Sequence, residues 1–240
     1  MRIGLAILNR NESAALPEVL PLIPREAVDL IFAVDGGSTD GSVGILESHG
    51  IPVLAQTSPG RGEAFRMAVE HARGSTDALI FFSPDGNEDP ADIARFRPHL
   101  EHGADLVIAS RMMEGAHNEE DVSWFRPRKW ANLFFDRLAR VTWGRGQPKI
   151  TDMINGYRAI TLEAWDRLRP DGPGFTIEYQ MSIRAYKHRA TVVEFPTHEG
   201  PRIGGASDAK ALRTGLRFVG LYLSELREGR RAGRGDSVGT

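Results

Sequence analysis

The sequence of 240 residues contains no cysteine, which excludes disulfide frameworks, thiolate metal sites and cysteine nucleophiles. It also lacks an excess of basic residues, because 30 Lys and Arg stand against 32 Asp and Glu. A net charge of −2 gives no whole-molecule argument for nucleic-acid binding, which normally needs a basic patch or stripe. We therefore expect no nucleic-acid partner. The absence of cysteine also fits a reducing, cytoplasmic location.

Long apolar runs are missing as well. A transmembrane helix needs roughly 20 apolar residues, and charged residues interrupt every candidate stretch. The N-terminal apolar run turns polar at Asn9, which makes it too short for a signal peptide, and no small-residue cleavage site follows. The sequence thus predicts a chain that does not cross a membrane by itself.

Glycine is absent from residues 9–14, although the whole chain has 26 glycines. Nicotinamide-binding Rossmann enzymes carry a glycine-rich loop directly after the first strand, and sugar nucleotidyltransferases have a comparable loop. The first predicted strand ends at Leu8, so the missing glycines exclude both classes of enzyme.

Short apolar runs alternate with helical patterns along the chain, which is typical of βαβ units around a mostly parallel sheet. Strands are predicted at Ile3–Leu8, Leu30–Val34, Pro52–Ala55, Ala78–Phe82, Asp105–Ala109 and Thr191–Phe195. Helices are predicted at Ala14–Leu22, Gly62–Ala72, Pro90–Leu100, Thr176–Tyr186 and Lys210–Leu226, with two more ending near Ser48 and Val141. The fold class is therefore a single α/β domain with helices flanking a central sheet.

The last predicted helix carries leucine and valine at alternating spacings of four and three, at Leu212, Leu216, Val219, Leu223 and Leu226. Such a stripe packs onto the core or onto a partner subunit in a homodimer. The alternative is peripheral contact with a membrane surface. Four arginines would assist such contact: Arg227, Arg230, Arg231 and Arg234. Residues 227–240 are expected to form a flexible tail.

Polar side chains follow four of the predicted strands. They are Asn11 and Glu12 after the first, Asp35 after the second, Asp85 to Asp89 after the fourth and Arg111 after the fifth. Because ligands of open α/β sheets bind beyond the carboxyl ends of the strands, these residues predict one cleft.

The turn after the fourth strand places oxygen-bearing side chains at alternate positions, Asp85, Asn87 and Asp89. In an extended segment these oxygens point the same way, and Mg²⁺ and Mn²⁺ prefer oxygen ligands. The turn has a second interpretation as an Asx-type turn, in which Asp89 caps the helix that begins at Pro90.

Seven short motifs then occur in a fixed order: Asn11-Glu12, Asp35–Ser42, Gly60–Ala64, Asp85–Asn87, Ala109–Arg111, Asn155–Ala159 and Arg202–Ser207. With these motifs the chain resembles a family 2 glycosyltransferase of the GT-A fold, and within it the dolichyl- or polyprenyl-phosphate mannose synthase-like branch. The resemblance covers most of Ile3 to Lys210. It implies the GT-A nucleotide-diphospho-sugar transferase fold, with a nucleotide-sugar-binding half in residues 1–111 and an acceptor-binding half in residues 112–226.

The resemblance also implies roles for individual residues. Contacts with the donor nucleotide fall to Glu12, Asp35, Asp85 and Arg61, although Arg61 has the alternative of only closing its turn. A divalent ion, Mg²⁺ or Mn²⁺, would be held by Asp85, Asn87 and Asp89. Phosphates of the donor or of a lipid-phosphate acceptor would be bound by Arg111, Arg128 and Arg202, each of which has the alternative of a surface ion pair. The catalytic set would be Asp85, Asp152, Arg111 and Arg202, in which Asp152 faces the sugar and is the general base if the acceptor is a sugar hydroxyl.

The implied reaction moves a hexose from a GDP- or UDP-linked sugar to an acceptor, a polyprenyl phosphate, with inversion at the anomeric carbon. Two departures from the family pattern bear on it: Gly36 and Asn87 each replace an aspartate. The loss of these carboxylates leaves an alternative open, a nucleotide-sugar-binding or scaffolding protein of the same fold in which catalysis has decayed.

Overall fold

The computed structural model describes residues 1–117, 127–203 and 211–235; the side chains of 127–129, 211–214 and 229–235 are not described. Within these ranges seven strands form one sheet in the order β3-β2-β1-β4-β6-β5-β7. The strands are β1 (Ile3–Asn9), β2 (Leu30–Asp35), β3 (Val53–Ala55), β4 (Ala78–Phe82), β5 (Leu106–Ser110), β6 (Arg158–Thr161) and β7 (Val192–Pro196). Neighbours are parallel except at β6, which runs antiparallel to both β4 and β5.

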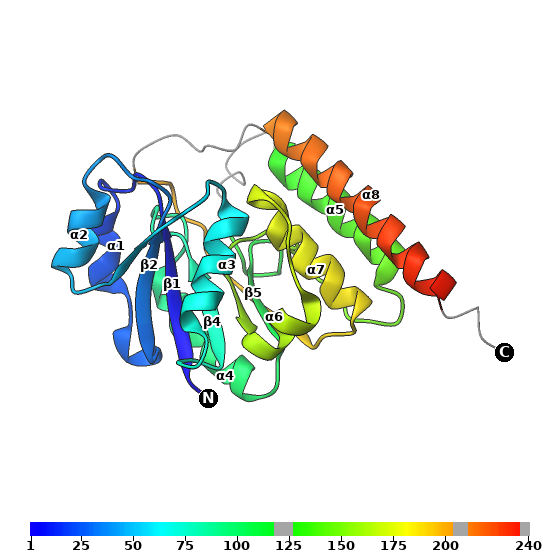
Figure 1. Ribbon diagram of the computed structural model, residues 1–240, viewed down its shortest axis with the longest axis horizontal. Coiled ribbons are helices and arrows are strands. Elements are labelled where there is room, and N and C mark those ends of the chain that lie inside the picture. Colours follow the sequence, from blue (N-terminus) through cyan, green and yellow to red (C-terminus); the bar gives the residue numbers. More distant parts are fainter. Residues whose placement is uncertain (118–126, 204–210, 236–240) are drawn as a thin grey trace.

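Helices lie on both sides of this sheet (Figure 1). They are α1 (Leu16–Val19), α2 (Ser42–Ser48), α3 (Arg61–Ala72), α4 (Ile93–Glu101), α5 (Pro127–Trp143), α6 (Leu162–Leu168), α7 (Ile177–Lys187) and α8 (Ala211–Gly235). Short 3₁₀ turns add η1 (Leu20–Leu22), η2 (Arg25–Ala27), η3 (Pro90–Asp92) and η5 (Gly174–Thr176). None of the helices in the described ranges has the length and apolarity that a membrane-spanning segment requires.

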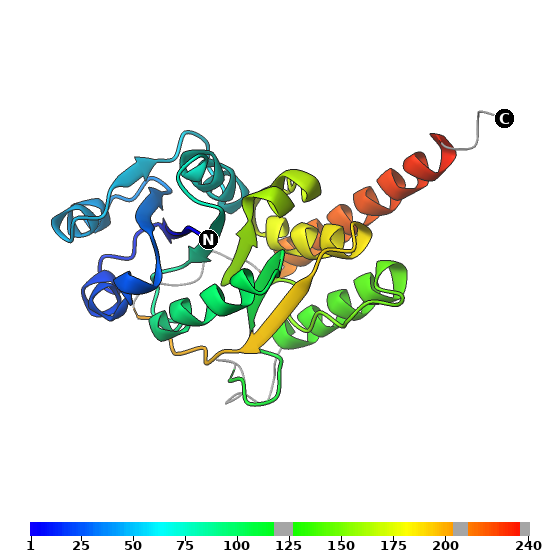
Figure 2. The same cartoon turned by 90° about the horizontal axis from the view of Figure 1, so that it is seen from below.

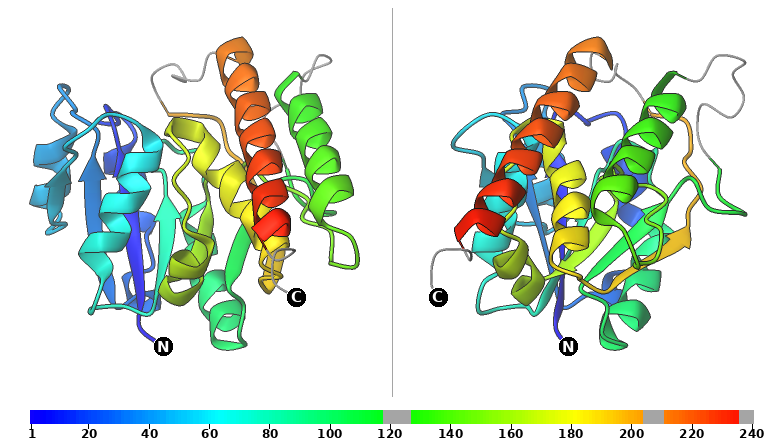
Figure 3. Two further views of the ribbon diagram at one scale, coloured as in Figure 1. Left: turned by 45° about the vertical axis from the view of Figure 1, so that its right-hand side comes forward. Right: turned by 90° about the vertical axis from the view of Figure 1, so that its right-hand side faces the viewer.

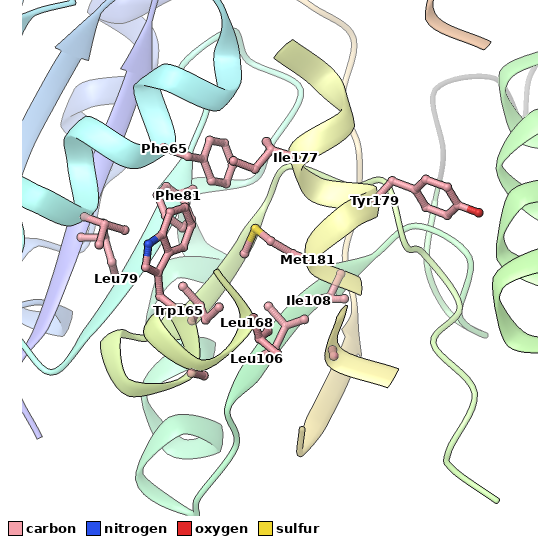
Figure 4. Packing of buried hydrophobic residues seen from close by; sticks show 14 of the residues in the cluster. Phe65, Leu79, Phe81, Leu106, Ile108, Trp165, Leu168, Ile177, Tyr179 and Met181 are labelled. Atoms are coloured by element: carbon pink, nitrogen blue, oxygen red, sulfur yellow. The ribbon is translucent and has the colours of Figure 1, made fainter. Parts of the chain in front are cut away.

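Both faces of the sheet are covered, which explains the nearly continuous apolar runs of the central strands. In β1, Ala6 and Leu8 belong to one core cluster, whereas Leu5 and Ile7 belong to the other. The first cluster includes residues of α3, α5, α6, α7 and α8, and the second includes residues of α1, α2 and α4. Figure 4 shows part of the first cluster, where the rings of Phe65 and Phe81 stack with centroids 3.9 Å apart.

Helices α5 and α8 lie side by side next to α7. The ring of Phe135 in α5 is 5.3 Å from that of Phe218 in α8 and 5.6 Å from that of Tyr179 in α7. Figure 3 shows α5 and α8 together on one side of the molecule, and Figure 2 shows the end of α8 projecting beyond the rest of the chain.

The structure confirms the predicted single α/β domain and its mostly parallel sheet, and it adds two elements that the sequence analysis missed. Strand β6 is only four residues long and contains Arg158, a charged residue that interrupts any apolar run. Helix α6 follows it directly and has seven residues, too few for a clear periodicity. The division into donor and acceptor halves at residue 111 stays a prediction.

Helix α8 continues to Gly235, so residues 227–235 continue a helix where a flexible tail was expected, and residues 236–240 of that tail lie outside the described residues. Leu216, Val219 and Leu223 of the predicted stripe are exposed, so these residues do not pack onto the core of this chain. The buried face instead carries Phe218 and Glu225, whose ring contacts and ion pairs fix the rotation of the helix. Packing of the stripe onto a partner subunit or contact with a membrane surface stays a prediction.

Candidate functional site

The parallel register brings the carboxyl ends of the strands to one edge, which we call the site edge. Asn9, the last residue of β1, lies opposite Asp35, the last residue of β2. Strand β4 pairs with the other side of β1, so that the turn beginning at Ser83 emerges beside them. The predicted gathering of strand ends is therefore present.

Asp35 is buried and organises the turn that follows it. One carboxylate oxygen accepts from Asn9 Nδ2 at 2.7 Å and from Ser38 Oγ at 2.5 Å. The other accepts from the backbone N–H groups of Gly37 at 3.0 Å and Ser38 at 2.9 Å. Four bonds use the acceptor capacity of a carboxylate, so a nucleoside contact would have to replace one of them. The predicted role of Asp35 in nucleotide binding stays a prediction.

Residues 197–203, which we call the strap, run alongside the turn after β4. The backbone N–H of Gly200 donates to Asn87 O, and that of Ile203 donates to Asp85 O, both at 2.9 Å. Gly86 has φ +86°, and a Cβ there would lie 2.6 Å from Ile203 Cγ1. Glycine at position 86 therefore allows both the turn and the close approach of the strap.

The strap delivers Arg202 to the predicted acidic residues. Its Nη1 donates to Asp85 Oδ2 at 3.0 Å, and its Nη2 donates to Glu12 Oε1. Its Nε is buried and has no hydrogen-bond partner among the described residues. Burial raises the pKa of Glu12 to about 7, against the attraction of Arg202 and with the help of Asp85. Three sequence-predicted site residues thus meet in one cluster.

A fourth carboxyl group, Glu88, stands next to this cluster. Its Oε2 accepts from the backbone N–H of Ser83 at 2.7 Å. Burial, together with the charge of Asp85, raises its pKa to about 8. Burial is the main cause of the raised pKa values of Glu12 and Glu88, and the negative charge of Asp85 adds to both.

The three predicted metal ligands do not share one role. Asn87 donates through Nδ2 to Gly200 O at 2.6 Å, so its amide oxygen is the end available to an ion. Asp89 Oδ1 accepts from Ala91 N at 2.9 Å and caps η3, which confirms the alternative interpretation for this residue. Among the residues that the structure describes, no group of three His, Asp or Glu side chains could hold a metal ion. Oxygen donors for a divalent ion could come from Asp85 and Asn87, and such a site stays a prediction.

Arg111 and Asp152 form a paired unit instead of two separate catalytic groups. Arg111 donates from Nε to Asp152 Oδ2 at 2.8 Å and from Nη2 to Asp152 Oδ1 at 3.0 Å. Asp152 is fully buried, and the adjacent guanidinium lowers its pKa against the effect of burial. A buried carboxylate of lowered pKa is a poor proton acceptor and faces no solvent. Asp152 thus contacts Arg111 and Asn132 in this structure, and its predicted role as the general base that faces the sugar stays a prediction.

Behind this pair lie two buried residues of α5. Asn132 donates to Asp152 Oδ1 at 2.8 Å, and Asp136 Oδ1 accepts from Met153 N at 3.3 Å. Asn132 Oδ1 and Asp136 Oδ2 have no partner among the described residues. Burial and the charge of Asp152 raise the pKa of Asp136 to about 9, so this acid is protonated at neutral pH. The two residues stand four apart in the sequence and so lie on one face of the helix.

Arg61 closes its turn rather than presenting a free guanidinium. Its Nε donates to the buried Glu178, and its Nη1 donates to Ser83 Oγ at 3.1 Å. Its guanidinium also lies over the ring of Phe65, 5.4 Å from the centroid. A Cβ at Gly156 would lie 2.0 Å from Arg61 Nη2, so glycine there gives the guanidinium its space.

Some of the predicted site residues have side chains that the structure does not describe, and some residues near the site were not predicted. Arg128 belongs to α5, but its side chain is not described, and residues 204–207 of the last motif lie outside the described ranges. The motifs assigned no role to Glu88 or to Glu178, the ion-pair partner of Arg61. They also assigned none to Glu199, whose Oε1 lies 3.3 Å from Arg111 Nη1, or to Asn132 and Asp136. Only Glu88 gave a signal, because it lies inside the predicted acidic turn.

Comparisons with known proteins agree with this geometry. The model of the family described as Glycosyl transferase family 2 matches residues 6–167. The chain is 30% identical to an undecaprenyl-phosphate mannosyltransferase of Micrococcus luteus over 82% of each chain. It is 28% identical to glycosyltransferase AglJ of Haloferax volcanii, over 88% of this chain and 68% of the relative. It is 27% identical to a polyprenol monophosphomannose synthase of Mycolicibacterium smegmatis, over 78% of this chain and 72% of the relative.

Solved structures give the same fold. Glucosyl-3-phosphoglycerate synthase from Mycobacterium tuberculosis, in complex with UDP, superposes with a TM-score of 0.69 at 19% identity, over 90% of this chain and 76% of that chain. The same enzyme with Mn²⁺ and UDP-glucose gives a TM-score of 0.68 at 19% identity, over 94% and 78%. The predicted GT-A fold is confirmed. From the family match and the seven-stranded sheet with its strand-end site, the chain belongs to glycosyl transferase family 2.

Proposed function

We propose that this chain transfers a hexose from a GDP- or UDP-linked sugar to a polyprenyl phosphate, with inversion at the anomeric carbon. The observation that carries the proposal is Arg202, whose guanidinium joins Glu12 to Asp85 while its buried Nε has no partner among the described residues. A buried N–H without an acceptor is costly, and a phosphate oxygen would supply the missing acceptor. Two relatives named for polyprenyl-phosphate or polyprenol mannosyl transfer support this acceptor class.

The pairing of the buried Asp152 with Arg111 also favours a phosphate acceptor over a sugar hydroxyl. A sugar hydroxyl must give up a proton during attack, whereas a phosphomonoester, with its second pKa near 6, is already mostly a dianion at neutral pH. Asp152 is committed to Arg111 and Asn132 and is fully buried. A phosphate oxygen attacking the anomeric carbon needs no such base.

In this mechanism the strand-end residues bind and orient the donor. Asp85 and Asn87 Oδ1 are the groups that would hold Mg²⁺ or Mn²⁺, in keeping with the Mn²⁺ bound by the structural relative. When bound, the ion neutralises charge that develops on the leaving diphosphate. Arg202 contributes positive charge next to Asp85. If the Arg202 guanidinium moves away from Asp85, its N–H groups become free to bind phosphate. A cytoplasmic location and a homodimer stay predictions.

A transfer assay tests the proposal. Purified protein is incubated with GDP-mannose, UDP-glucose or other nucleotide hexoses, with Mn²⁺ and a polyprenyl phosphate in detergent, and lipid-linked sugar is extracted and quantified. We expect one donor to give a lipid-phosphate sugar whose anomeric configuration is inverted by NMR. Tight nucleotide binding with no transfer to any acceptor would contradict the proposal and favour the decayed, binding-only alternative.

A further inference from the structure

A cavity of about 1340 Å³ lies among the last residues of helices α5, α6 and α7, and we call it the rear cavity. Its volume exceeds the roughly 300–1,000 Å³ that is typical of small-molecule sites, so a small molecule has room there. Trp143 and Leu168 give it an apolar wall. Six basic residues also line it: Arg145, Arg167, Arg169, Arg184, Lys187 and Arg189.

The rear cavity lies at the edge of the sheet opposite to the site edge. Arg167 of its lining pairs at 2.7 Å with Asp105, which directly precedes β5. Asp166 pairs at 2.7 Å with Arg73, which stands between α3 and β4. Both partners thus mark the starts of strands, whereas the site edge gathers their carboxyl ends. Figure 1 shows α6 toward the side on which the N-terminus lies and β1 begins.

Positive charge prevails in the rear cavity. Its lining contains the six basic residues but only three acidic ones, and one of these, Glu225, is buried and already pairs with two of the basic residues. Three arginines of the lining form no salt bridge with any residue that the structure describes: Arg145, Arg169 and Arg189. These guanidinium groups therefore keep their charge available for an added anion.

The imidazole of His188, which also lines the cavity, responds to this charge. Burial lowers the pKa of His188, and three neighbouring cations lower it further against the weaker opposite effect of Glu225. These cations are Arg167, Arg184 and Lys187. Positive charge thus outweighs negative charge at this position, which favours an anion.

Two of the arginines occupy backbone positions that favour glycine. Arg169 has φ +48° and Arg189 has φ +52°, in the left-handed region that L side chains rarely adopt. Arg189 stands two residues beyond the end of α7, and the same position after α2, α3 and α4 is glycine at positive φ. These glycines are Gly50, Gly74 and Gly103. At the rear cavity the chain thus keeps an arginine where its other helix ends have glycine.

The turn that carries Arg169 is held from within the chain. Arg184 donates from Nη1 to the carbonyl oxygen of Arg169 and from Nε to Glu225 Oε1 at 2.9 Å. Lys187 Nζ donates to Glu225 O at 2.8 Å. Two lining cations therefore fix the ends of α6 and α7 against α8, while the arginines without a salt bridge surround the open space.

We propose that the rear cavity binds a small molecule that carries several phosphate groups. Guanidinium groups bind phosphate oxygens through paired N–H donors, and three of them without a salt bridge match an anion of several charges. The apolar wall of Trp143 and Leu168 accommodates the body of the ligand. The proposal does not rest on the proposed function, because it concerns the opposite edge of the sheet.

Calorimetry with tripolyphosphate tests the proposal, in metal-free buffer and with no sugar donor or acceptor. Citrate is the comparison ligand, because it carries several charges on carboxylates. The test variant of the full chain is Arg169→Gly with Arg189→Gly. The matched control is Arg25→Ala with Arg137→Ala, which removes two charges at exposed positions outside the cavity. Arg145→Ala is a second test variant, in the turn after α5 and away from both positive-φ positions.

We expect the glycine variant to bind tripolyphosphate at least tenfold more weakly than wild type, Arg145→Ala at least threefold more weakly, and the control within twofold. Citrate should bind wild type at least tenfold more weakly than tripolyphosphate does. The glycine variant should unfold at the same temperature as wild type or higher, because glycine adopts positive φ without strain.

No binding to wild type, or unchanged binding to the glycine variant and to Arg145→Ala, would overturn the proposal. Equal affinity for citrate would overturn the assignment of phosphate as the ligand group. A lower unfolding temperature of the glycine variant with unchanged binding would show that the two arginines only complement the carbonyl ends of α6 and α7. Because donor, acceptor and metal are absent, failure here leaves the transfer assay unaffected.

Discussion

Replacement of Asp136 by asparagine should stabilise the protein at neutral pH. Asp136 is buried, and its pKa rises from an ordinary value of 3.8 to about 9 in the folded chain. The folded state therefore holds one proton more than the unfolded state between these two values. The contribution of Asp136 to the free energy of unfolding is greatest below about pH 4. It falls as the pH rises from about 4 to about 9, because the carboxyl group loses its proton more easily in the unfolded chain.

The size of the effect follows from the same numbers. When the folded state binds one proton more than the unfolded state, the free energy of unfolding falls by about 1.4 kcal/mol per pH unit. Through Asp136 alone, the free energy of unfolding of wild type should therefore fall by about 4 kcal/mol between pH 4 and pH 7. Asparagine is neutral at every pH. Its Oδ1 can accept from Met153 N, as the Asp136 oxygen does. Asp136→Asn should thus match wild type near pH 4 and exceed it by about 4 kcal/mol at pH 7.

Urea unfolding across the pH range measures this difference. Glu12, Glu88 and Glu194 also have raised pKa values, so the difference between variant and wild type, rather than either curve alone, isolates Asp136. Asp136→Leu provides a control, because leucine is neutral but cannot accept the hydrogen bond from Met153 N and should gain less. Parallel stability curves for wild type and Asp136→Asn would refute the argument that Asp136 is protonated in the fold.

Close packing at glycine and the contacts of Arg202 can be tested by substitution as well. Gly62→Ala should destabilise the fold by several kcal/mol in urea titrations, because its Cβ would lie 2.2 Å from Gly172 O. Gly44→Ala, in open space on α2, should be neutral or gain up to about 1 kcal/mol, and equal losses for both would refute the packing argument. Arg202→Ala should raise the acceptor KM by about tenfold or more with less effect on donor binding by calorimetry, and Arg202→Lys should restore part of it. An unchanged acceptor KM and kcat would count against phosphate binding by Arg202.

The sequence predicts those features of the fold that depend on periodicity along the chain. Alternating buried strands and helices, and polar residues at strand ends, place Glu12, Asp35 and Asp85 at one edge, as the structure has them. Strand β6 was not predicted because its first residue, Arg158, is charged, and a charged residue is not expected in a buried strand. Arg158 is nevertheless fully buried, because its guanidinium donates hydrogen bonds to backbone oxygens such as Asn155 O and Glu178 O.

Pairings between distant segments could not be predicted. Arg61 and Glu178 are 117 residues apart, and Arg111 and Asp152 are 41 apart. The sequence shows the charges but not which of them neutralise one another, and this pairing decides whether Asp152 can be a base. Likewise, periodicity identified the apolar stripe of α8 but not its direction, which Phe218 and Glu225 determine by packing inward.

If Asp85 supports sugar transfer at the strand ends, the transfer rate of Asp85→Ala must fall. Asp85 is half-buried and bonded to Arg202, whereas Asp166, the control, is exposed and paired with Arg73 outside the site. With the donor that wild type accepts and a polyprenyl phosphate, Asp85→Ala should remain folded and lose at least a hundredfold in kcat/KM, while Asp166→Ala stays within twofold of wild type. Near-wild-type transfer by folded Asp85→Ala would show that Asp85 has no part in the reaction.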